Sequence, residues 1–175
     1  MPKPLAESFQ FCPSCGAEVA QTGDHPFRCR ECDFCFYFGP TSAVGGIVSN
    51  LSGEILFLIR GRDPGKGKYG LPGGFTDPKE TLEQSLIREV QEETSLNVVT
   101  CEYLCSFPNQ YDYQGFTTDV LDSFFVCTVD TFDNLKAQPG EVERFEICFP
   151  DERVLSNLAF HSNRLALEHY LQSRK

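Results

Sequence analysis

Residues 71–96 read LPGGFTDPKETLEQSLIREVQEETSL, a glycine-rich turn followed by the pattern of an amphipathic helix. Asp77, Pro78 and Glu80 suit the N-cap, the first helical turn and the reciprocal capping position, which predicts a helix from about Pro78 to Ser95. At about 100° per residue, its apolar side chains form one stripe, made of Leu82, Leu86, Ile87 and Val90. The stretch therefore predicts a helix that packs on a core by one face.

Three glutamates, Glu89, Glu92 and Glu93, lie along the edge of that stripe instead of on the solvent side. Their spacing brings the carboxylates close together, and partial burial makes their charges costly to keep. Glutamates on a helix are usually just solvated, but carboxylates that repel one another at a buried edge need a cation among them. The pattern therefore predicts a divalent metal site.

The spacing from Gly74 through Glu80 to Arg88–Leu96 resembles the Nudix box, GX5EX7REUXEEXGU, in which U is an apolar residue. Every defined position matches except Ser95, where the pattern has glycine. Ser95 falls at the C-terminus of the predicted helix, where a left-handed residue commonly closes the last turn. We therefore expect Ser95 to cost some stability without removing a metal ligand.

The resemblance covers residues 40–175 and implies an α/β/α sandwich around a mixed sheet, in which the box forms a loop, a helix and a loop. It implies that Mg²⁺ or Mn²⁺ is bound by Gly74, through its carbonyl, and by Glu89, Glu92 and Glu93. Arg88 would orient Glu89, and Glu80 would be a supporting residue.

The rest of this predicted domain consists mainly of strands. Thr41–Val48 and Glu54–Arg60 are joined by a turn at residues 49–53, which predicts a hairpin. Further runs rich in aromatic and β-branched residues predict strands over residues 97–107, 120–129 and 144–149. A second helix is expected over residues 162–172, and residues 61–70 are expected to form a mobile basic loop whose Lys66 and Lys68 are candidates for a phosphate contact.

The N-terminal 39 residues contain two CxxC pairs, Cys12 with Cys15 and Cys29 with Cys32, at a spacing close to that of four-thiolate zinc sites. We expect a small zinc ribbon over residues 1–39, stabilised by the metal because so short a segment has little core. Cys35 could replace one ligand, and His25 is a third possibility. A ribbon ahead of such a domain resembles bacterial NADH pyrophosphatases. We expect the ribbon to act as a scaffold or as a contact in a homodimer.

The composition excludes several classes of function. Fifteen basic and 25 acidic residues give a net charge of −10, so we expect no nucleic-acid partner, because nonspecific binding needs a basic surface. The longest apolar run, Ile55–Ile59, is far shorter than the roughly 20 residues of a membrane span, and the N-terminus lacks the apolar segment of a secretory signal. We therefore expect a cytoplasmic chain that binds a small nucleotide through cations.

Clustered glutamates suit hydrolysis of a diphosphate, since divalent ions activate water and neutralise phosphate charge. We expect a pyrophosphohydrolase that cleaves a nucleoside diphosphate linked to another moiety, and the resemblance points to the NADH or ADP-ribose class. The base that takes the proton from water is open between Glu89 and Glu141, with Glu141 ranked above Glu143. The exact substrate, the oligomeric state and the choice between Mg²⁺ and Mn²⁺ are also open. The alternative is a nucleotide-sensing module whose ribbon contacts a protein or nucleic acid.

Overall fold

The computed structural model describes residues 2–50 and 52–174. The chain divides into two compact units. The first, here called the ribbon unit, comprises Met1–Thr41 and Gln110–Val120; the second, the sheet unit, comprises Ser42–Asn109 and Leu121–Lys175.

The sheet unit is built around one sheet. Its strands are β4 (Thr41–Ser49), β5 (Ile55–Arg60), β6 (Tyr69–Gly70), β7 (Gly73–Phe75), β8 (Val98–Tyr113), β9 (Phe116–Val129) and β10 (Val142–Cys148). Strands β9, β4, β5 and β10 follow one another across the sheet, while β8 pairs with β9, β7 with β4 and β6 with β5. The predicted hairpin is confirmed, because β4 and β5 are antiparallel with Ser49 opposite Ile55. Strands β8 and β9 extend beyond the predicted runs.

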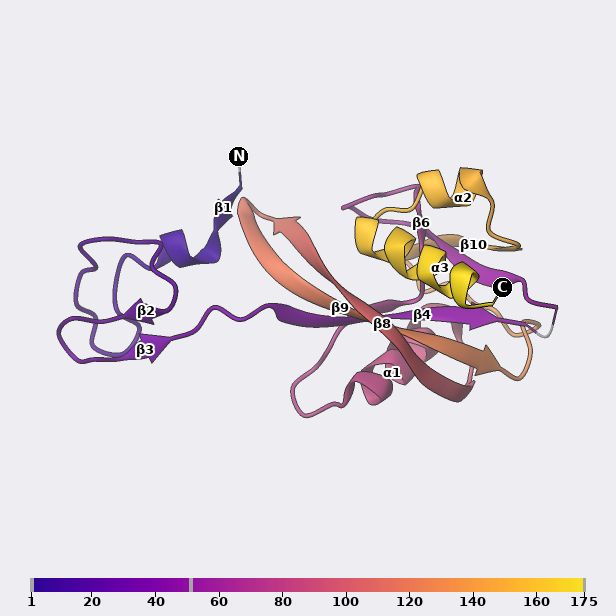
Figure 1. The fold of residues 1–175 in the computed structure, drawn as a ribbon, viewed down its shortest axis with the longest axis horizontal. Helices are drawn as coiled ribbons and strands as arrows, with labels where there is room; N and C mark the ends of the chain where they lie inside the picture. The colour runs from indigo at the N-terminus through magenta and orange to yellow at the C-terminus, as the bar shows by residue number, and fades with distance from the viewer. Residues whose placement is uncertain (1, 51, 175) are drawn as a thin grey trace. The chain divides into compact units, whose positions relative to one another are not determined.

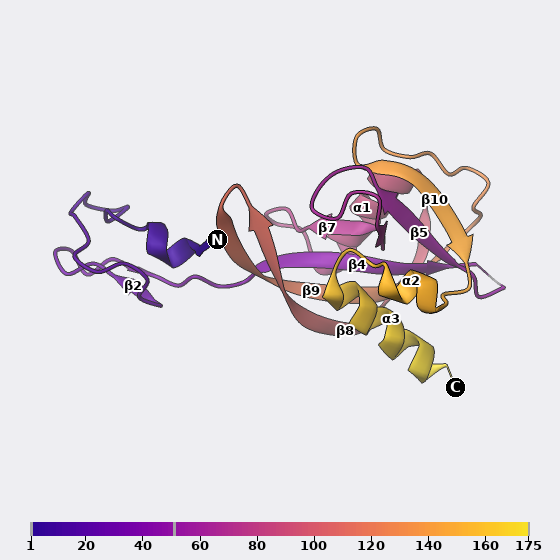
Figure 2. The same cartoon turned by 90° about the horizontal axis from the view of Figure 1, so that it is seen from above.

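Helices cover both faces of this sheet. Helix α1 (Leu82–Thr94) lies on one face, and α2 (Glu152–Ser156) and α3 (His161–Ser173) lie on the other (Figures 1 and 2). Alternate residues of β5 point to opposite faces: Phe57 belongs to the core cluster with Leu167 of α3, and Leu56 to the cluster with Leu86 of α1. The predicted α/β/α sandwich is therefore confirmed. No helix within the described residues has the length and apolar character needed to cross a membrane.

The ribbon unit has a core of rings and thiols. Strands β2 (Phe27–Arg28) and β3 (Cys35–Phe36) are antiparallel, preceded by the short strand β1 (Lys3–Pro4) and the 3₁₀ helix η1 (Leu5–Ser8). Strand β1 pairs in parallel with the start of β9, which belongs to the same unit. Cys12, Phe27 and Cys29 are buried together, and the ring of Phe9 contacts those of Phe27 and Phe38. So small a core fits the expectation that the thiols are held by a metal.

The first helix begins later than predicted. The N-cap is Thr81 instead of Asp77, and the Thr81 side chain forms a capping box with Gln84. Lys79 adopts a left-handed backbone with φ of 76°, which no α-helix can contain, so residues 77–80 form a separate turn closed by the Glu80 N–H and the Asp77 carbonyl at 3.2 Å.

Ile87 and Ser95 are two further positions of this helix for which the sequence made a prediction; the first prediction is wrong and the second is confirmed. Ile87 was assigned to the buried stripe, but its side chain is 43% exposed, because it lies at the rim of the face that packs on the sheet. Ser95 is the C-cap and has φ of 63° and ψ of 17°. The left-handed conformation predicted for Ser95 is therefore confirmed.

Candidate active site and metal centres

The glycine-rich turn before α1 brings the backbone against the helix. The N–H of Gly73 donates to Glu93 Oε2 at 2.8 Å, and β7 pairs Gly73 with Gly45 and Gly74 with Val44 of β4. Gly73 has φ of 147°, and a Cβ there would lie 2.1 Å from the Val44 carbonyl oxygen. Only glycine can occupy this position, because any side chain would collide with the neighbouring strand.

Gly74 lies just as close to Glu89. A Cβ at Gly74 would lie 2.7 Å from Glu89 Cδ and Oε1 and 2.9 Å from Oε2. The absent side chain therefore leaves the space that the Glu89 carboxylate occupies. The predicted ligands Gly74, Glu89 and Glu93 are thus brought together at one end of α1.

Arg88 joins several carboxylates. Its Nε donates to Glu80 Oε1 at 3.0 Å, and its Nη1 donates to Glu89 Oε1 at 2.8 Å and to Glu92 Oε2 at 3.2 Å. Its Nη2 also donates to the carbonyl of Phe75. The bonds to Arg88 lower the pKa of Glu80, and the bonds to Glu80 and Glu89 raise that of Arg88. The arginine thus contacts Glu89, the residue that the resemblance implies it orients.

The glutamates of this cluster place several carboxylates in a partly buried position. Glu93 is only 7% exposed, and burial raises its pKa to about 8 in spite of the hydrogen bond from Gly73. Burial also raises the pKa of Glu89, although Arg88 opposes that shift. The charge of Glu141 raises the pKa of both residues. Oxygen donors arranged in this way are destabilised when all are ionised, and a divalent cation would stabilise them.

Glu141 reaches this cluster from a distant part of the sequence. The loop that carries it docks on the end of α1, where the Gln138 N–H donates to the Glu93 carbonyl at 3.3 Å. The Gly61 N–H donates to the Glu141 carbonyl at 2.7 Å, and Arg62 Nη2 lies 2.7 Å from Glu141 Oε2. Glu143 instead pairs with the exposed Arg144 at 2.6 Å. Of the two glutamates considered in this loop, Glu141 is the one whose charge acts on Glu89 and Glu93.

The four cysteines of the two predicted pairs converge in the ribbon unit. The Sγ atoms of Cys12 and Cys32 are 3.8 Å apart and those of Cys15 and Cys29 are 3.7 Å apart, and all four lie within 4.8 Å of one another. A tetrahedral shell with Zn–S bonds of about 2.3 Å has edges of about 3.8 Å. Cys35 lies on β3, outside this group. The thiols therefore have the geometry of a four-thiolate zinc site.

The state of Cys12 also suits a metal ligand. Burial acts to raise the pKa of its thiol, but the backbone N–H groups of Cys15 and Ser14 lower that pKa to about 7. The backbone N–H of Ala17 acts to lower the pKa of Cys15, but contact with the Cys32 thiol and burial raise that pKa to about 12. The thiolate is the form that binds metal, and a bound Zn²⁺ would deprotonate both thiols.

Sequence reasoning missed a buried acid in the sheet unit. Asp122 of β9 is 9% exposed, and its Oδ2 accepts from Ser162 Oγ at 2.5 Å and from Asn109 Nδ2 at 2.9 Å. Burial raises the pKa of Asp122. It ties the start of α3 to the sheet, and no sequence motif marks it, because its two partners come from two other elements, β8 and α3.

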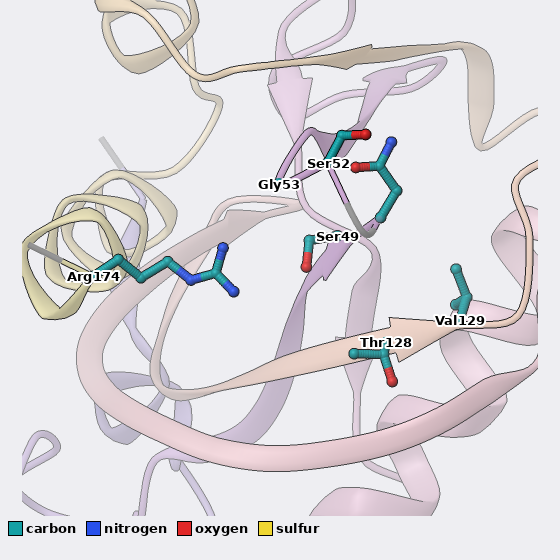
Figure 3. A pocket seen from close by; sticks show the side chains of 7 residues that line it. Ser49, Ser52, Gly53, Thr128, Val129 and Arg174 are labelled. Carbon is teal, nitrogen blue, oxygen red and sulfur yellow. The ribbon is translucent and has the colours of Figure 1, made fainter.

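A cavity of about 310 Å³ opens at the other end of β5, between Ser49, Ser52, Thr128 and Arg174 (Figure 3). It adjoins the Ile55 end of β5, because Ser49 is the residue opposite Ile55. Glu141 lies by the Arg60 end, five residues away, or about 17 Å along the strand. The cavity contains none of the predicted site residues.

Comparisons with known proteins agree with this geometry. A family model described as "NUDIX domain" matches residues 39–168. A protein of Pseudomonas fluorescens named "NAD-capped RNA hydrolase NudC" is 30% identical over 134 residues, or 74% of this chain and 48% of that protein. An "ADP-ribose pyrophosphatase" of Methanocaldococcus jannaschii is 43% identical over 60 residues, or 34% of this chain and 35% of that protein. The chain spans about a third to a half of the length of these curated relatives.

Solved structures share the fold. A NUDIX hydrolase of Nitrosomonas europaea superimposes with a TM-score of 0.70 at 24% identity, covering 94% of this chain and 92% of that one. The NUDIX domain of Shewanella oneidensis NrtR, solved in complex with ADP ribose, has a TM-score of 0.62 at 24% identity and covers 78% of this chain and 90% of that one.

Proposed function

Because this chain belongs to the NUDIX domain family, we propose that it is a metal-dependent pyrophosphohydrolase. It cleaves the diphosphate bond of a nucleoside diphosphate linked to a second moiety. The observation that supports this most is the position of the Glu89 and Glu93 carboxylates: Glu93 accepts from the N–H of Gly73, and Glu89 occupies the space that a side chain at position 74 would take. A binding surface alone would not require carboxylates to be buried against one another at such cost.

The proposed ligands of the catalytic Mg²⁺ or Mn²⁺ are the Gly74 carbonyl and the carboxylates of Glu89, Glu92 and Glu93. They fit these ions, because carboxylate and carbonyl oxygens are the donors that hard divalent cations prefer. When bound, such ions lower the pKa of water and neutralise phosphate oxygens. Arg88 holds Glu89 in place, and Glu80 holds Arg88.

Two carboxylates are proposed as bases for the attacking water. Glu89 is buried beside Gly74, and Glu141 faces the same cluster from the loop before β10. Either can accept the proton at a carboxylate oxygen while the diphosphate is held by bound cations. A Glu141→Gln variant that loses kcat at saturating Mn²⁺ would identify Glu141 as the base, whereas unchanged kcat would leave Glu89.

We further propose one structural Zn²⁺ on Cys12, Cys15, Cys29 and Cys32, in a ribbon over residues 1–39 ahead of a catalytic domain over residues 40–175. In a reducing cytoplasm the thiols stay available as ligands. Four thiolates fill a tetrahedral shell and leave no position for water, so this ion supports folding instead of catalysis. Metal analysis should find one zinc per chain and less in Cys12→Ser, and a zinc-free full-length chain would refute the site.

The proposed substrates are NADH and ADP-ribose. The first follows from the resemblance to NADH pyrophosphatases, and the second is the substrate for which one relative is named. A small nucleotide can bind to an acidic chain through bound cations. NAD-capped RNA is added to the assay because one relative is named for it. The test is a panel of these substrates with nucleotide sugars, dinucleoside polyphosphates and nucleoside triphosphates, each with Mg²⁺ or Mn²⁺.

The control for this panel is a pair of site variants. Glu92→Gln and Glu93→Gln should each lose most of the turnover while remaining folded, since each removes a ligand and also relieves repulsion in the metal-free cluster. Near wild-type turnover in both would refute the metal cluster. No turnover of any substrate by the wild type would instead favour a nucleotide-sensing module.

A further inference from the structure

Arg62 lies next to the loop that carries Glu141. Strand β5 ends at Arg60, and Gly61 then contacts the loop before β10 through its backbone. A Cβ at Gly61 would lie 3.1 Å from the Glu141 carbonyl oxygen, so the backbones of the two segments are in close contact. The backbone of Glu141 is therefore held by contacts that do not involve the Arg62 side chain.

The side chain of Glu141 has a different restraint. Its Oε2 lies 2.7 Å from Arg62 Nη2, and the two side chains are 29% and 60% exposed. The loop that carries Glu141 contacts the C-terminal turn of α1, where the Gln138 N–H donates to the Glu93 carbonyl at 3.3 Å, and the charge of Glu141 acts on both Glu89 and Glu93. The carboxylate of Glu141 thus pairs with one arginine and lies within electrostatic reach of the proposed metal ligands.

Two competitions follow from this placement. A divalent cation bound by Glu89 and Glu93 competes with the guanidinium for the Glu141 carboxylate, and a phosphate of the substrate competes with that carboxylate for the guanidinium. Either exchange alone would leave one charge without a partner. When both occur, every charge is paired again, so each exchange favours the other.

We propose that Arg62 is a positioning residue that exchanges partners when the substrate binds. Before that, Arg62 restrains the Glu141 carboxylate. Once Arg62 pairs with a phosphate of the substrate, Glu141 is free to turn towards the cation held by Glu89 and Glu93. This inference rests on the proposed function. Under this proposal, Arg62 lowers the affinity for the cation when no substrate is present and raises the affinity for the substrate. Removing Arg62 should therefore change the two affinities in opposite directions. A merely structural arginine would weaken both when removed.

The test compares Arg62→Gln with Arg144→Gln in the full-length chain. Arg144 is a matched control, because it is also 60% exposed and also pairs with a glutamate, Glu143. Both variants lose one positive charge. The first measurement is the affinity for Mn²⁺ without substrate, followed by the electron paramagnetic resonance of free Mn²⁺, and the second is KM for whichever of NADH and ADP-ribose is turned over.

Arg62→Gln should bind Mn²⁺ roughly twofold to fivefold more tightly than wild type, the range expected from loss of one exposed ion pair. Its KM should rise on the order of tenfold, as for loss of a charged hydrogen bond, with a smaller change in kcat. Arg144→Gln should change neither quantity appreciably. In a Glu141→Gln background, Arg62→Gln should lose most of its effect on Mn²⁺ affinity and keep its effect on KM.

Weaker or unchanged Mn²⁺ binding in Arg62→Gln would overturn the proposal. An equal rise in Mn²⁺ affinity when Arg62→Gln is made in the Glu141→Gln background would also overturn it, because the effect would then be one of net charge alone. An unchanged KM would overturn the phosphate contact. The Mn²⁺ measurement does not depend on turnover. If no substrate is hydrolysed, the proposed function fails, and the restraint of Glu141 by Arg62 is still decided by Mn²⁺ binding.

Discussion

Replacing Arg88 by methionine should show how much the Arg88 guanidinium contributes to the stability and the activity of the site. The side chain is 25% exposed, and it pairs with Glu80, Glu89 and Glu92, of which Glu89 is 16% exposed. Methionine keeps much of the apolar stem and removes only the guanidinium. In the variant, three carboxylates stay close together without their cation.

The magnitude follows from burial. Removing one partner of a buried ion pair costs about 3–5 kcal/mol, whereas an exposed pair is worth at most about 1 kcal/mol. Arg88 lies between these limits, so we expect a loss of about 2 kcal/mol in the free energy of unfolding. For a chain of this size that corresponds to about 4–8 °C in Tm. Turnover should fall further, on the order of 100-fold, because Glu89 is no longer oriented.

The assay is thermal unfolding without added Mg²⁺, together with steady-state kinetics. Arg144→Met is the control, since it removes a cation from an exposed pair and should shift the free energy of unfolding by no more than about 0.5 kcal/mol. If Arg88→Met unfolds at the same temperature as Arg144→Met, the network does not stabilise the fold. If its turnover also matches wild type, Arg88 does not orient Glu89.

Three further predictions, which use four substitutions, test separate parts of the structure. Ser95→Gly should stabilise the chain by about 0.5–1 kcal/mol, because glycine adopts the left-handed conformation without strain but has more freedom when unfolded; an unchanged or lower Tm would contradict this. Asp122→Asn keeps an oxygen acceptor and removes the charge. Since burial raises the pKa of Asp122 above its unfolded value of about 3.9, wild type should lose stability relative to the variant as the pH rises from about 4 through the folded pKa, and a constant difference in denaturant midpoints would refute it. Gly74→Ala should fold yet lose Mn²⁺ affinity and turnover, because its methyl group displaces only the end of Glu89, whereas Gly73→Ala should fail to fold because it meets backbone; circular dichroism and Mn²⁺ titration separate the two.

Much of the site follows from local geometry. Residues three and four apart lie on one side of a helix whatever the helix packs against, so the common edge of Glu89, Glu92 and Glu93 was predictable. Likewise, the two residues between the cysteines of each pair place both thiols on one side of a turn, as Cys12 and Cys15 show. The left-handed Ser95 follows from its place after the last helical turn.

Other features depended on segments that meet only in the folded chain. The helix begins at Leu82 because Lys79 turns out of the helical conformation, although the residues around it suit a helix start. Ile87 is exposed because the sheet covers only part of the apolar stripe. Asp122 is bonded to residues of two other elements, and periodicity within one element contains no information about such partners.

Glu141 shows the same limit in the site itself. Sequence reasoning could rank it above Glu143, but not show which of the two approaches Glu89 and Glu93. That outcome depends on the pairing of β10 with β5 and on the bulge between Val142 and Arg144, since an extra residue in a strand changes which side chains face a given side. Spacing along one helix is set by the backbone and can be read from a single segment. The approach of two strands is set by the packing of the whole sheet, so only the tertiary structure decided which glutamate acts by its charge on Glu89 and Glu93.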